Sequence, residues 1–358
     1  MAVLRFALIG CGNIARKHAE ALRRIEGAEL AAVCDVDAGR ARAIGTEHHV
    51  PHFTDQEQML ASEPIDVLSV LTPSGDHAAR MLDLVRHKKH MVVEKPLTLR
   101  LEDADSMIEA CDTAGVRLFV VKQNRYNRPI RAARRALEAG RFGKLVLGTI
   151  RVRWCRPQSY YDSAPWRGTW EHDGGVLTNQ ASHHIDMLEW MMGDVESVTS
   201  MIATRLVKIE VEDTGVAILR FRSGALGVIE ATSATRPRDL EGSISILGEK
   251  GSVVVGGFAM DKLVTWQFAE PHPEDETIFQ TDGENPPDPA WNHTEYLRDV
   301  VETIQTGRKA LVDGLEGRKS LELINAIYES AETGREIPLR FRPKRCRLGI
   351  RGSEADHT

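Results

Sequence analysis

The sequence predicts an α/β protein with two halves of different texture: a parallel sheet covered by helices on both faces, then a mostly antiparallel sheet. Three observations support this prediction. The length of 358 residues corresponds to two domains at roughly 150 residues each. Residues 1–121 alternate helical stretches with short runs that are apolar on both faces, as strands between helix layers are. From about residue 145, short turns that contain glycine separate strand-like segments, which favours hairpins.

The elements of the first half follow one another in a regular order. We expect strands at residues 3–9, 29–35, 67–71, 90–93 and 117–121. Helices are expected between them at 14–25, 38–45, 77–87 and 101–114. This alternation predicts a parallel sheet, because each helix returns the chain to the same end of the sheet.

The second half has a different pattern. Strands are expected at 145–153, 195–207, 214–222, 226–234, 242–248 and 251–255. Flanking helices are expected at 131–139, 183–192, 292–305 and 315–333. Residues 270–290 are rich in Pro, Asp and Glu and predict an exposed loop, and residues 343–358 form a short basic tail.

Composition excludes several classes of protein. Hydrophobic residues make up 42% and charged residues 27%, so whole-chain disorder is excluded. The net charge of −6 argues against a nucleic-acid-binding protein. No apolar run reaches the ~18 residues that span a bilayer, and Arg5 interrupts the first apolar segment, which predicts a buried strand rather than a leader. The 5 cysteines are widely spaced and form no CxxC pair, which indicates reduced thiols in the cytoplasm.

The turn after the first strand has the pattern of a dinucleotide-binding site. Gly10-Cys11-Gly12-Asn13-Ile14-Ala15 fits G-x-G-x-x-G/A between an expected strand and an expected helix. Gly10 permits the tight turn and Gly12 lets the backbone approach a pyrophosphate, while Asn13 and Ile14 open the helix. Asp35 ends the second strand, where a carboxylate accepts the ribose hydroxyls and repels a 2′-phosphate. We therefore predict NAD as the cofactor.

A second group of residues follows the next strands at the same edge of the sheet. Glu94-Lys95-Pro96 comes directly after the strand at 90–93, and Thr72, Ser74 and His77 follow the strand at 67–71. Ligands bind at the carboxyl ends of such strands. These residues are therefore predicted to line the cofactor cleft.

The third site lies in the second half. Asn179 and His183 are four residues apart, which predicts that they share a helix face. A neutral histidine can accept the proton of a hydroxyl group while hydride leaves the same carbon. His183 and the adjacent His184 point in different directions and no metal-ligand spacing accompanies them, so we expect no metal, and His184 stays unassigned.

Three motifs together resemble the Gfo/Idh/MocA oxidoreductases, named for glucose–fructose oxidoreductase and inositol dehydrogenase: Gly10-x-Gly12-x-x-Ala15, Glu94-Lys95-Pro96 and Gly174-Gly175…His183-x-Ile185-Asp186. The resemblance extends from residue 3 to about 340 in the right order. It implies a Rossmann domain followed by a domain with a large open-faced, mostly antiparallel sheet. It also implies that Lys95 and His183 flank the reacting carbon. Many relatives have Asp at the position of Asn179, which weakens an inositol-dehydrogenase assignment and leaves His183 as the base.

The asparagine at position 179 is part of a second, narrower resemblance. The segments around Asn179 and His183, with Gln123 in 122–127 and Trp166 in 166–168, resemble the UDP-N-acetylglucosaminuronate 3-dehydrogenases. This similarity implies an NAD enzyme, commonly tetrameric, that oxidises the sugar 3-hydroxyl during synthesis of bacterial surface polysaccharides such as lipopolysaccharide. It places Gln123 and Trp166 at the cofactor. Some of these enzymes recycle a bound cofactor with 2-oxoglutarate.

Residues 151–167 have a composition compatible with an acidic nucleotide sugar. Four arginines accompany four aromatic residues there, and arginine binds carboxylate and phosphate while aromatic rings stack on sugar or uracil. Arg156, Tyr160 and Arg167 lie beyond the expected strand and are the predicted substrate contacts. Arg151 and Arg153 are equally compatible with a strand face in solvent.

These residues lead to one mechanism and three alternatives. Hydride passes from sugar C3 to nicotinamide, His183 accepts the hydroxyl proton, Lys95 stabilises the alkoxide and Asn179 orients the sugar. The alternatives are a family member that acts on inositol, a polyol or a deoxysugar nucleotide, a non-catalytic NAD-binding regulator, and a dihydrodiol- or biliverdin-reductase-like enzyme, which Asp35 disfavours. We expect an NAD-binding domain at 1–121, a domain for substrate binding and oligomerisation at 122–342, and a homo-oligomer, either dimer or tetramer.

Overall fold

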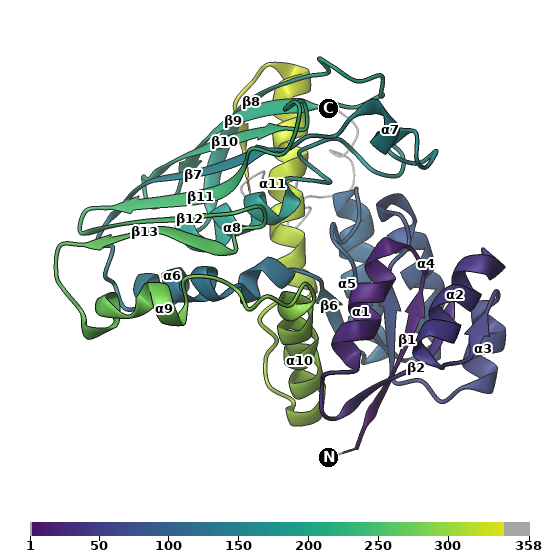
Figure 1. Ribbon diagram of the computed structural model, residues 1–358. Coiled ribbons are helices and arrows are strands. Elements are labelled where there is room, and N and C mark those ends of the chain that lie inside the picture. The colour runs from purple at the N-terminus through teal and green to yellow at the C-terminus, as the bar shows by residue number, and fades with distance from the viewer. Residues whose placement is uncertain (1, 340–358) are drawn as a thin grey trace, which may run out of the picture.

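The computed structural model describes residues 2–339, so the predicted basic tail at 343–358 lies outside the described residues. It has two sheets, each with its own helices (Figure 1). No helix within the described range is long and apolar enough to cross a membrane. Cys11, Cys34, Cys111 and Cys155 are free thiols, and Cys346 lies in the part not described.

The first sheet has six parallel strands in the order β3-β2-β1-β4-β5-β6. The strand order reverses between β1 and β4, and in open α/β sheets ligands bind at the carboxyl ends of the strands on either side of such a reversal. Its strands are β1 (Leu4–Ile9), β2 (Ala28–Cys34), β3 (His52–Phe53), β4 (Val67–Val70), β5 (His90–Val93) and β6 (Leu118–Val120).

Helices cover both faces of this sheet, as the sequence predicts. They are α1 (Asn13–Leu22), α2 (Ala38–His48), α3 (Gln56–Ser62), α4 (His77–Leu84) and α5 (Leu101–Ala114), with short 3₁₀ turns η1 (Ser74–Asp76) and η2 (Val85–His87). Two separate apolar cores lie on the two sides of the strands, because β1 presents Phe6 and Leu8 to one side and Ala7 and Ile9 to the other. The parallel sheet predicted from strands that are apolar on both faces is confirmed.

The second sheet has eight strands in the order β13-β12-β11-β7-β10-β9-β8-β14. Its strands are β7 (Leu145–Arg153), β8 (Val195–Ala203), β9 (Thr214–Phe221), β10 (Leu226–Thr232), β11 (Glu241–Gly248), β12 (Gly251–Gly256), β13 (Lys262–Phe268) and β14 (Ile337–Pro338). Helices α6 (Arg128–Glu138), α8 (Ser182–Met192) and α11 (Gly314–Thr333) pack against one face. Alternate side chains on the other face are exposed, which confirms an open-faced, mostly antiparallel sheet.

Two helices late in the chain connect the halves. Helix α10 (Trp291–Thr306) packs on α1 and on the 3₁₀ turn η3 (Gln123–Tyr126), and Tyr296 and Leu297 enter the core of the first half. The start of α11 packs on β6 and α5 and its remainder on β8 and α8, so this long helix runs along both halves (Figure 1).

The structure differs from the sequence prediction at several places. Strands β3 and β14 were not predicted because they have only two residues each, and the seven-residue elements β13 and α3 were also not predicted. The pair β7–β10 is parallel, since the chain returns through α8, β8 and β9 before it reaches β10. The expected loop 270–290 contains η4 (Pro273–Glu276) and α9 (Ile278–Thr281), because Ile278 is fully buried and Asp275 accepts hydrogen bonds from Arg141 and Trp266.

Candidate active site

The turn between β1 and α1 has the geometry that a dinucleotide requires. Gly10 has a φ of +102°, and a Cβ there would lie 2.8 Å from the carbonyl oxygen of Leu71. Gly12 is the N-cap of α1, and a Cβ there would meet nothing within 4 Å, so the backbone is open to a ligand. No side chain caps this helix, whose first amides, at Asn13 and Ile14, therefore suit a diphosphate.

Asp35 follows β2 and supports the same turn. Its carboxylate accepts hydrogen bonds from the backbone N–H groups of Cys11 at 2.7 Å and Asp37 at 2.8 Å. Each carboxylate oxygen retains a further acceptor position, which suits a ribose hydroxyl. The residues at this end of the sheet therefore fit a bound NAD.

The segment after β4 forms the second wall of this cleft. Thr72 has a buried hydroxyl without a hydrogen-bond partner, a free polar group that fits a ligand here, and Ser74 is half-buried in η1. His77 is buried, and its nitrogens lie 2.8 Å from the carbonyl oxygen of Thr72 and 2.9 Å from that of Pro96. The ring lies between the loops after β4 and β5, and its pKa is lowered by burial, so the neutral ring donates its one N–H to one of these two carbonyls; a contact of His77 with the cofactor stays a prediction.

Glu94 anchors the turn after β5. It is buried, and one carboxylate oxygen lies 3.0 Å from His18 Nε2 while the other accepts the backbone N–H of Lys95 at 2.9 Å. Burial opposes ionisation, yet the hydrogen bond with His18 and nearby positive charges lower the pKa of Glu94 to about 2. The carboxylate therefore stays ionised, next to the lysine of the site.

His293 of α10 completes a buried group with His18 and Glu94, whose possible ligand atoms lie within 4.8 Å of one another. The 3.0 Å between His18 and Glu94 is a hydrogen-bond distance, shorter than the ~3.3 Å between two ligands of a tetrahedral zinc ion. His293 Nε2 lies 3.9 Å from Glu94. We interpret the group as a hydrogen-bonded cluster that holds Glu94.

Lys95, Asn179 and His183 meet between the two halves, although they come from segments far apart in the sequence. Lys95 Nζ donates to the backbone oxygen of Asn179 at 2.9 Å. Burial lowers the pKa of Lys95, and the charges of Glu94 and Asp173 oppose that shift. A protonated lysine at this point can stabilise negative charge that develops on a substrate oxygen.

His183, the second residue of α8, is suited to accept a proton. Burial, followed by the positive charges of Lys95 and Lys122, lowers its pKa well below the usual value. The ring is therefore neutral at neutral pH, and its Nε2 lies 3.1 Å from Gln123 Nε2. The Gln123 amide donates to Nε2, so Nε2 is the unprotonated ring nitrogen, and a substrate hydroxyl that takes the place of this amide can give its proton there.

A buried ion cluster fixes the helix that carries His183. Both oxygens of Asp186 accept hydrogen bonds from Arg125 at 2.9 Å, and Lys122 Nζ lies 3.5 Å from the same carboxylate. Lys122 also donates to Ser320 of α11 at 2.7 Å. The cluster joins the segment that carries Gln123 to the helix that carries His183.

Asn179 corrects the expectation of a shared helix face with His183. Helix α8 begins at Ser182, and Asn179 lies in the preceding turn. The helix does not extend back because tertiary contacts engage that turn: Leu177 N–H donates to Glu212 at 2.9 Å, and Thr178 lies 2.8 Å from the Tyr328 hydroxyl.

The predicted substrate contacts form a cluster beside α7 (Gln158–Tyr161). Arg167 donates to the Tyr160 hydroxyl at 2.5 Å, and its guanidinium lies over the rings of Tyr160 and Trp166. Arg156 lies 3.1 Å from Asp239, which neutralises part of its charge. Arg167 is thus the predicted arginine without a carboxylate partner at ion-pair distance within the described residues.

Arg151 and Arg153 belong to the outer face of the second sheet. Both form ion pairs with Glu230 and Glu241 of the neighbouring strands β10 and β11. The sequence left open whether Arg151 and Arg153 contact the substrate or lie on a strand face in solvent. The ion pairs favour the strand face, because the glutamates already balance the charges of both arginines.

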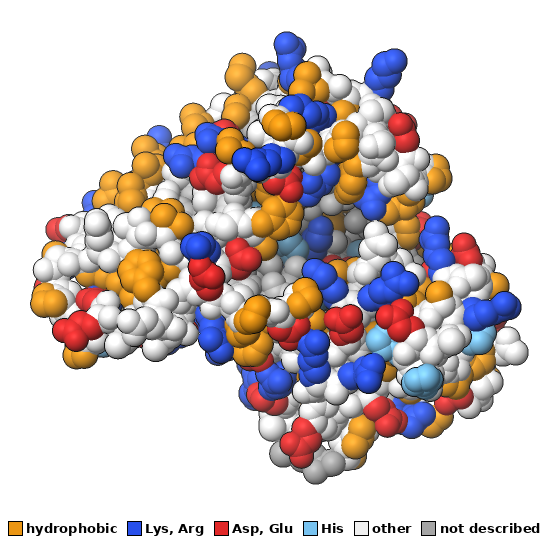
Figure 2. Space-filling model, in the orientation of Figure 1, with side chains coloured by type: hydrophobic (Ala, Val, Ile, Leu, Met, Phe, Trp, Pro, Cys, Tyr) orange, Lys and Arg blue, Asp and Glu red, His pale blue; other side chains and the backbone are white. Residues whose placement is uncertain are grey.

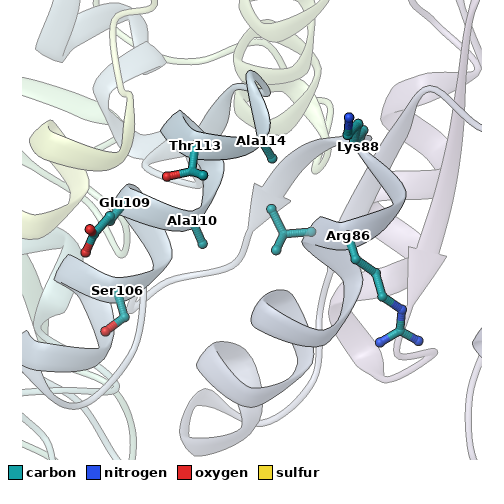
Figure 3. Close-up of a pocket in the computed structure, with 8 residues that line it drawn as sticks. Arg86, Lys88, Ser106, Glu109, Ala110, Thr113 and Ala114 are labelled. Atoms are coloured by element: carbon teal, nitrogen blue, oxygen red, sulfur yellow. The ribbon is translucent and has the colours of Figure 1, made fainter.

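A cavity of about 640 Å³ opens beside His183. Figure 2 shows a hollow between the two halves of the molecule, with histidine and cationic side chains on its floor. Residues of both halves line the cavity: Lys17, Gln123, Asn124, Trp154, His183, 257–259, 261–262, 284–289 and 291–293. A second pocket, between η2 and α5, is lined by residues such as Arg86, Ser106 and Glu109 and shares none with the first (Figure 3).

Two family models match this chain. The model described as "Oxidoreductase family, NAD-binding Rossmann fold" matches residues 4–122, and the one described as "Oxidoreductase family, C-terminal alpha/beta domain" matches residues 134–339. The chain belongs to the Gfo/Idh/MocA oxidoreductase family. It is thus an NAD-dependent oxidoreductase, as the glycine turn and Asp35 predict, and the resemblance inferred from the three motifs is confirmed.

Solved structures and characterised relatives agree with the family. The WlbA dehydrogenase from Bordetella pertussis, in complex with NADH and UDP-GlcNAcA, is 44% identical with a TM-score of 0.89, covering 94% of this chain and 98% of that one. The WlbA dehydrogenase from Chromobacterium violaceum, with the same ligands, is also 44% identical with a TM-score of 0.89, covering 95% and 97%. The myo-inositol 2-dehydrogenase of Thermotoga maritima is 28% identical over 94% of this chain and 98% of its own length.

Several residues of this Gfo/Idh/MocA oxidoreductase's site were missed in the sequence. Asp173, Glu212 and Tyr328 hold the turn that carries Asn179, and His293 contacts Glu94 from α10. Asp173 precedes Gly174-Gly175 and could have been noticed as part of that motif. The other three lie in segments without any local signal, since only the fold brings them to the site.

Proposed function

We propose that this oxidoreductase is a sugar dehydrogenase that oxidises the 3-hydroxyl of UDP-N-acetylglucosaminuronic acid to the 3-keto sugar. The observation that carries the proposal is the 44% identity with two WlbA structures that contain NADH and UDP-GlcNAcA. The site supports it with a neutral histidine, a half-buried lysine and the half-buried guanidinium of Arg167 beside aromatic rings. An acidic substrate suits that arginine, because guanidinium binds carboxylate and phosphate strongly.

The protein groups have separate roles in this proposal. NAD, when bound at Gly10, Gly12 and Asp35, supplies the acceptor for the hydride. His183 accepts the proton of the sugar hydroxyl at Nε2. Lys95 donates a hydrogen bond to the oxygen on which negative charge develops. Asn179 orients the sugar.

The other residues around the site are assigned either to the cofactor or to the substrate. We assign Thr72, Ser74, Glu94, Gln123 and Trp166 to the cofactor side, where Glu94 acts through the Lys95 turn. Arg156, Tyr160 and Arg167 are assigned to the substrate. We retain the division into an NAD-binding domain at 1–121 and a substrate domain at 122–342, with the addition that α10 and the start of α11 pack on the first half.

We further propose that the protein is a cytoplasmic homo-oligomer, a dimer or tetramer, of surface-polysaccharide synthesis, with 2-oxoglutarate as a candidate oxidant for bound NADH. The open face of the second sheet supports the oligomer. Exposed apolar side chains gather on it, including Met201, Val216 and Ile218, with exposed fractions of 75%, 45% and 62%. Orange side chains follow β8 to β10 along this edge in Figure 2. A second copy of the sheet would cover them.

A substrate panel tests the proposed function. The purified protein is assayed for NADH formation with UDP-GlcNAcA, UDP-GlcNAc, myo-inositol and D-apiose. We expect kcat/KM for UDP-GlcNAcA to exceed that for UDP-GlcNAc by at least about 100-fold, since the 6-carboxylate alone distinguishes them. Preference for myo-inositol would favour the polyol alternative, and failure to turn over any of the four would favour an NAD-binding regulator.

A further inference from the structure

Asp173 is a buried carboxylate that the mechanism above does not use. Only 1% of the residue is exposed, and it lies just before the turn that carries Asn179. One carboxylate oxygen accepts the backbone N–H of Gly168 at 2.8 Å, and the other accepts a hydrogen bond from the side-chain amide of Asn179. Burial of a carboxylate costs free energy unless hydrogen bonds and a nearby positive charge compensate for the lost water.

The positive charges that face Asp173 are Lys95 and Arg167. Burial raises the pKa of Asp173, while its hydrogen bonds and these two cations oppose the shift. The charged groups around Lys95 itself are Glu94 and Asp173, which favour its ammonium form, and Lys122 and Arg167, which disfavour it. Asp173 is therefore one of two carboxylates that offset the burial of Lys95.

The contacts of Asn179 leave one polar atom available. Its backbone N–H donates to Gly175, its backbone oxygen accepts from Lys95, and its side-chain nitrogen donates to Asp173. Within the described residues, no protein group donates to its side-chain oxygen. A ligand in the site would thus meet Asn179 as a hydrogen-bond acceptor, the arrangement that a substrate hydroxyl requires.

We propose that Asp173 is a positioning residue of the dehydrogenation: it orients the Asn179 amide so that the oxygen is left for the substrate, and it supplies negative charge beside the Lys95 ammonium. The proposal rests on the proposed function in that Lys95 and His183 form the reacting site. The competing explanation is that Asp173 only holds the loop through Gly168.

Two variants separate these explanations. Asp173→Asn removes the charge and replaces one of the two acceptor oxygens by an NH2 donor, so the side chain can no longer accept from both Gly168 N–H and the Asn179 amide. The exchange Asp173→Asn with Asn179→Asp rebuilds a hydrogen bond between the two positions in the opposite direction and returns a carboxylate beside Lys95. Glu171→Gln is the matched control, since Glu171 is exposed two residues away. Thermal unfolding of each variant, alone and with NADH, establishes that it is folded.

We expect Asp173→Asn to lower kcat about tenfold or more while NADH affinity changes less than about threefold. We also expect the alkaline limb of kcat/KM to move about one pH unit lower, because loss of the negative charge lowers the pKa of Lys95. The exchanged pair should recover at least about half of the shift and part of kcat, and Glu171→Gln should match the wild type. If Asp173 had a purely structural role, the alkaline limb of kcat/KM would lie at the same pH in the wild type, Asp173→Asn and the exchanged pair.

The proposal is overturned if Asp173→Asn keeps kcat within about twofold and leaves the alkaline limb unmoved. It is also overturned if the exchanged pair is folded but restores neither quantity. Should the wild type turn over no substrate, the proposed function fails. The rate at which an acylating reagent labels Lys95, followed against pH by mass spectrometry, then tests the effect of Asp173 directly: an unchanged profile in Asp173→Asn refutes it.

Discussion

Glu212 provides a pH-dependent contribution to stability that can be measured. It is 1% exposed, accepts hydrogen bonds from Leu177 N–H and the Tyr328 hydroxyl at 2.9 Å each, and has a second oxygen without a partner. Burial, although opposed by its hydrogen bonds, raises its pKa from 4.5 to about 7. The folded protein therefore holds this proton more tightly than the unfolded chain does.

The sign and size of the effect follow from that difference. A carboxyl group whose pKa is raised on folding contributes its full stabilisation below pH 4.5, and the contribution is lost as the pH rises through about 7. With these two values, the free energy of unfolding contributed by Glu212 falls by about 2.5 kcal/mol between about pH 5 and pH 8. Glu212→Gln imitates the protonated acid and removes this dependence.

The assay is guanidinium unfolding, followed by tryptophan fluorescence, of the wild type and Glu212→Gln at about pH 5 and pH 8. The difference between the two proteins isolates Glu212, because all other titrating groups are common to both. We expect Glu212→Gln to gain about 2.5 kcal/mol relative to the wild type over this interval. Glu210→Gln, at an exposed position nearby, is the matched control. A difference that changes by less than about 0.5 kcal/mol for Glu212→Gln would refute the reasoning.

Three further predictions concern the site. Lys95→Ala and His183→Asn should each lower kcat by about 100-fold or more in a steady-state NADH assay with UDP-GlcNAcA, and near-wild-type turnover in either would contradict its role. Asp35→Ala should lower kcat/KM for NAD about tenfold and raise the ratio for NADP over NAD, because the carboxylate no longer repels a 2′-phosphate; an unchanged ratio would be evidence against that contact. Asp186→Asn should lower the free energy of unfolding by about 3–5 kcal/mol in denaturant titrations, because Lys122 loses its carboxylate partner and Arg125 keeps only Glu316, and a loss below about 1 kcal/mol would show that these cations find other partners.

Local patterns were sufficient for most elements of the fold. The glycine turn between β1 and α1, the acidic end of β2 and strand β5 before Pro96 each occupy one short segment, so they could be predicted from spacing and polarity alone. The helices at 101–114 and 315–333 were likewise predicted to within one residue of their bounds. Short elements such as β3 and α9 were missed, because two to four residues carry too little periodicity.

The site was only partly predictable for a different reason. Lys95, Asn179 and His183 were identified from their motifs, but the expected helix face shared by Asn179 and His183 was wrong. Glu212 and Tyr328 take up hydrogen-bonding groups of that turn, and neither residue is near it in the sequence. The sequence could not show that His77 is buried between the backbone carbonyls of Thr72 and Pro96, and its contact with the cofactor stays a prediction.

The amino-acid sequence by itself determined the two-sheet organisation, the dinucleotide turn, the preference for NAD and the family, because these depend on residues close together in the chain. The tertiary structure alone decided which charges meet. It paired Arg151 and Arg153 with glutamates, surrounded Lys95 and His183 with buried cations and carboxylates, and joined Asp173 to Asn179. Those outcomes depend on distances of a few ångströms between segments far apart in the chain, and electrostatic interactions at such distances are strong only where the fold excludes water.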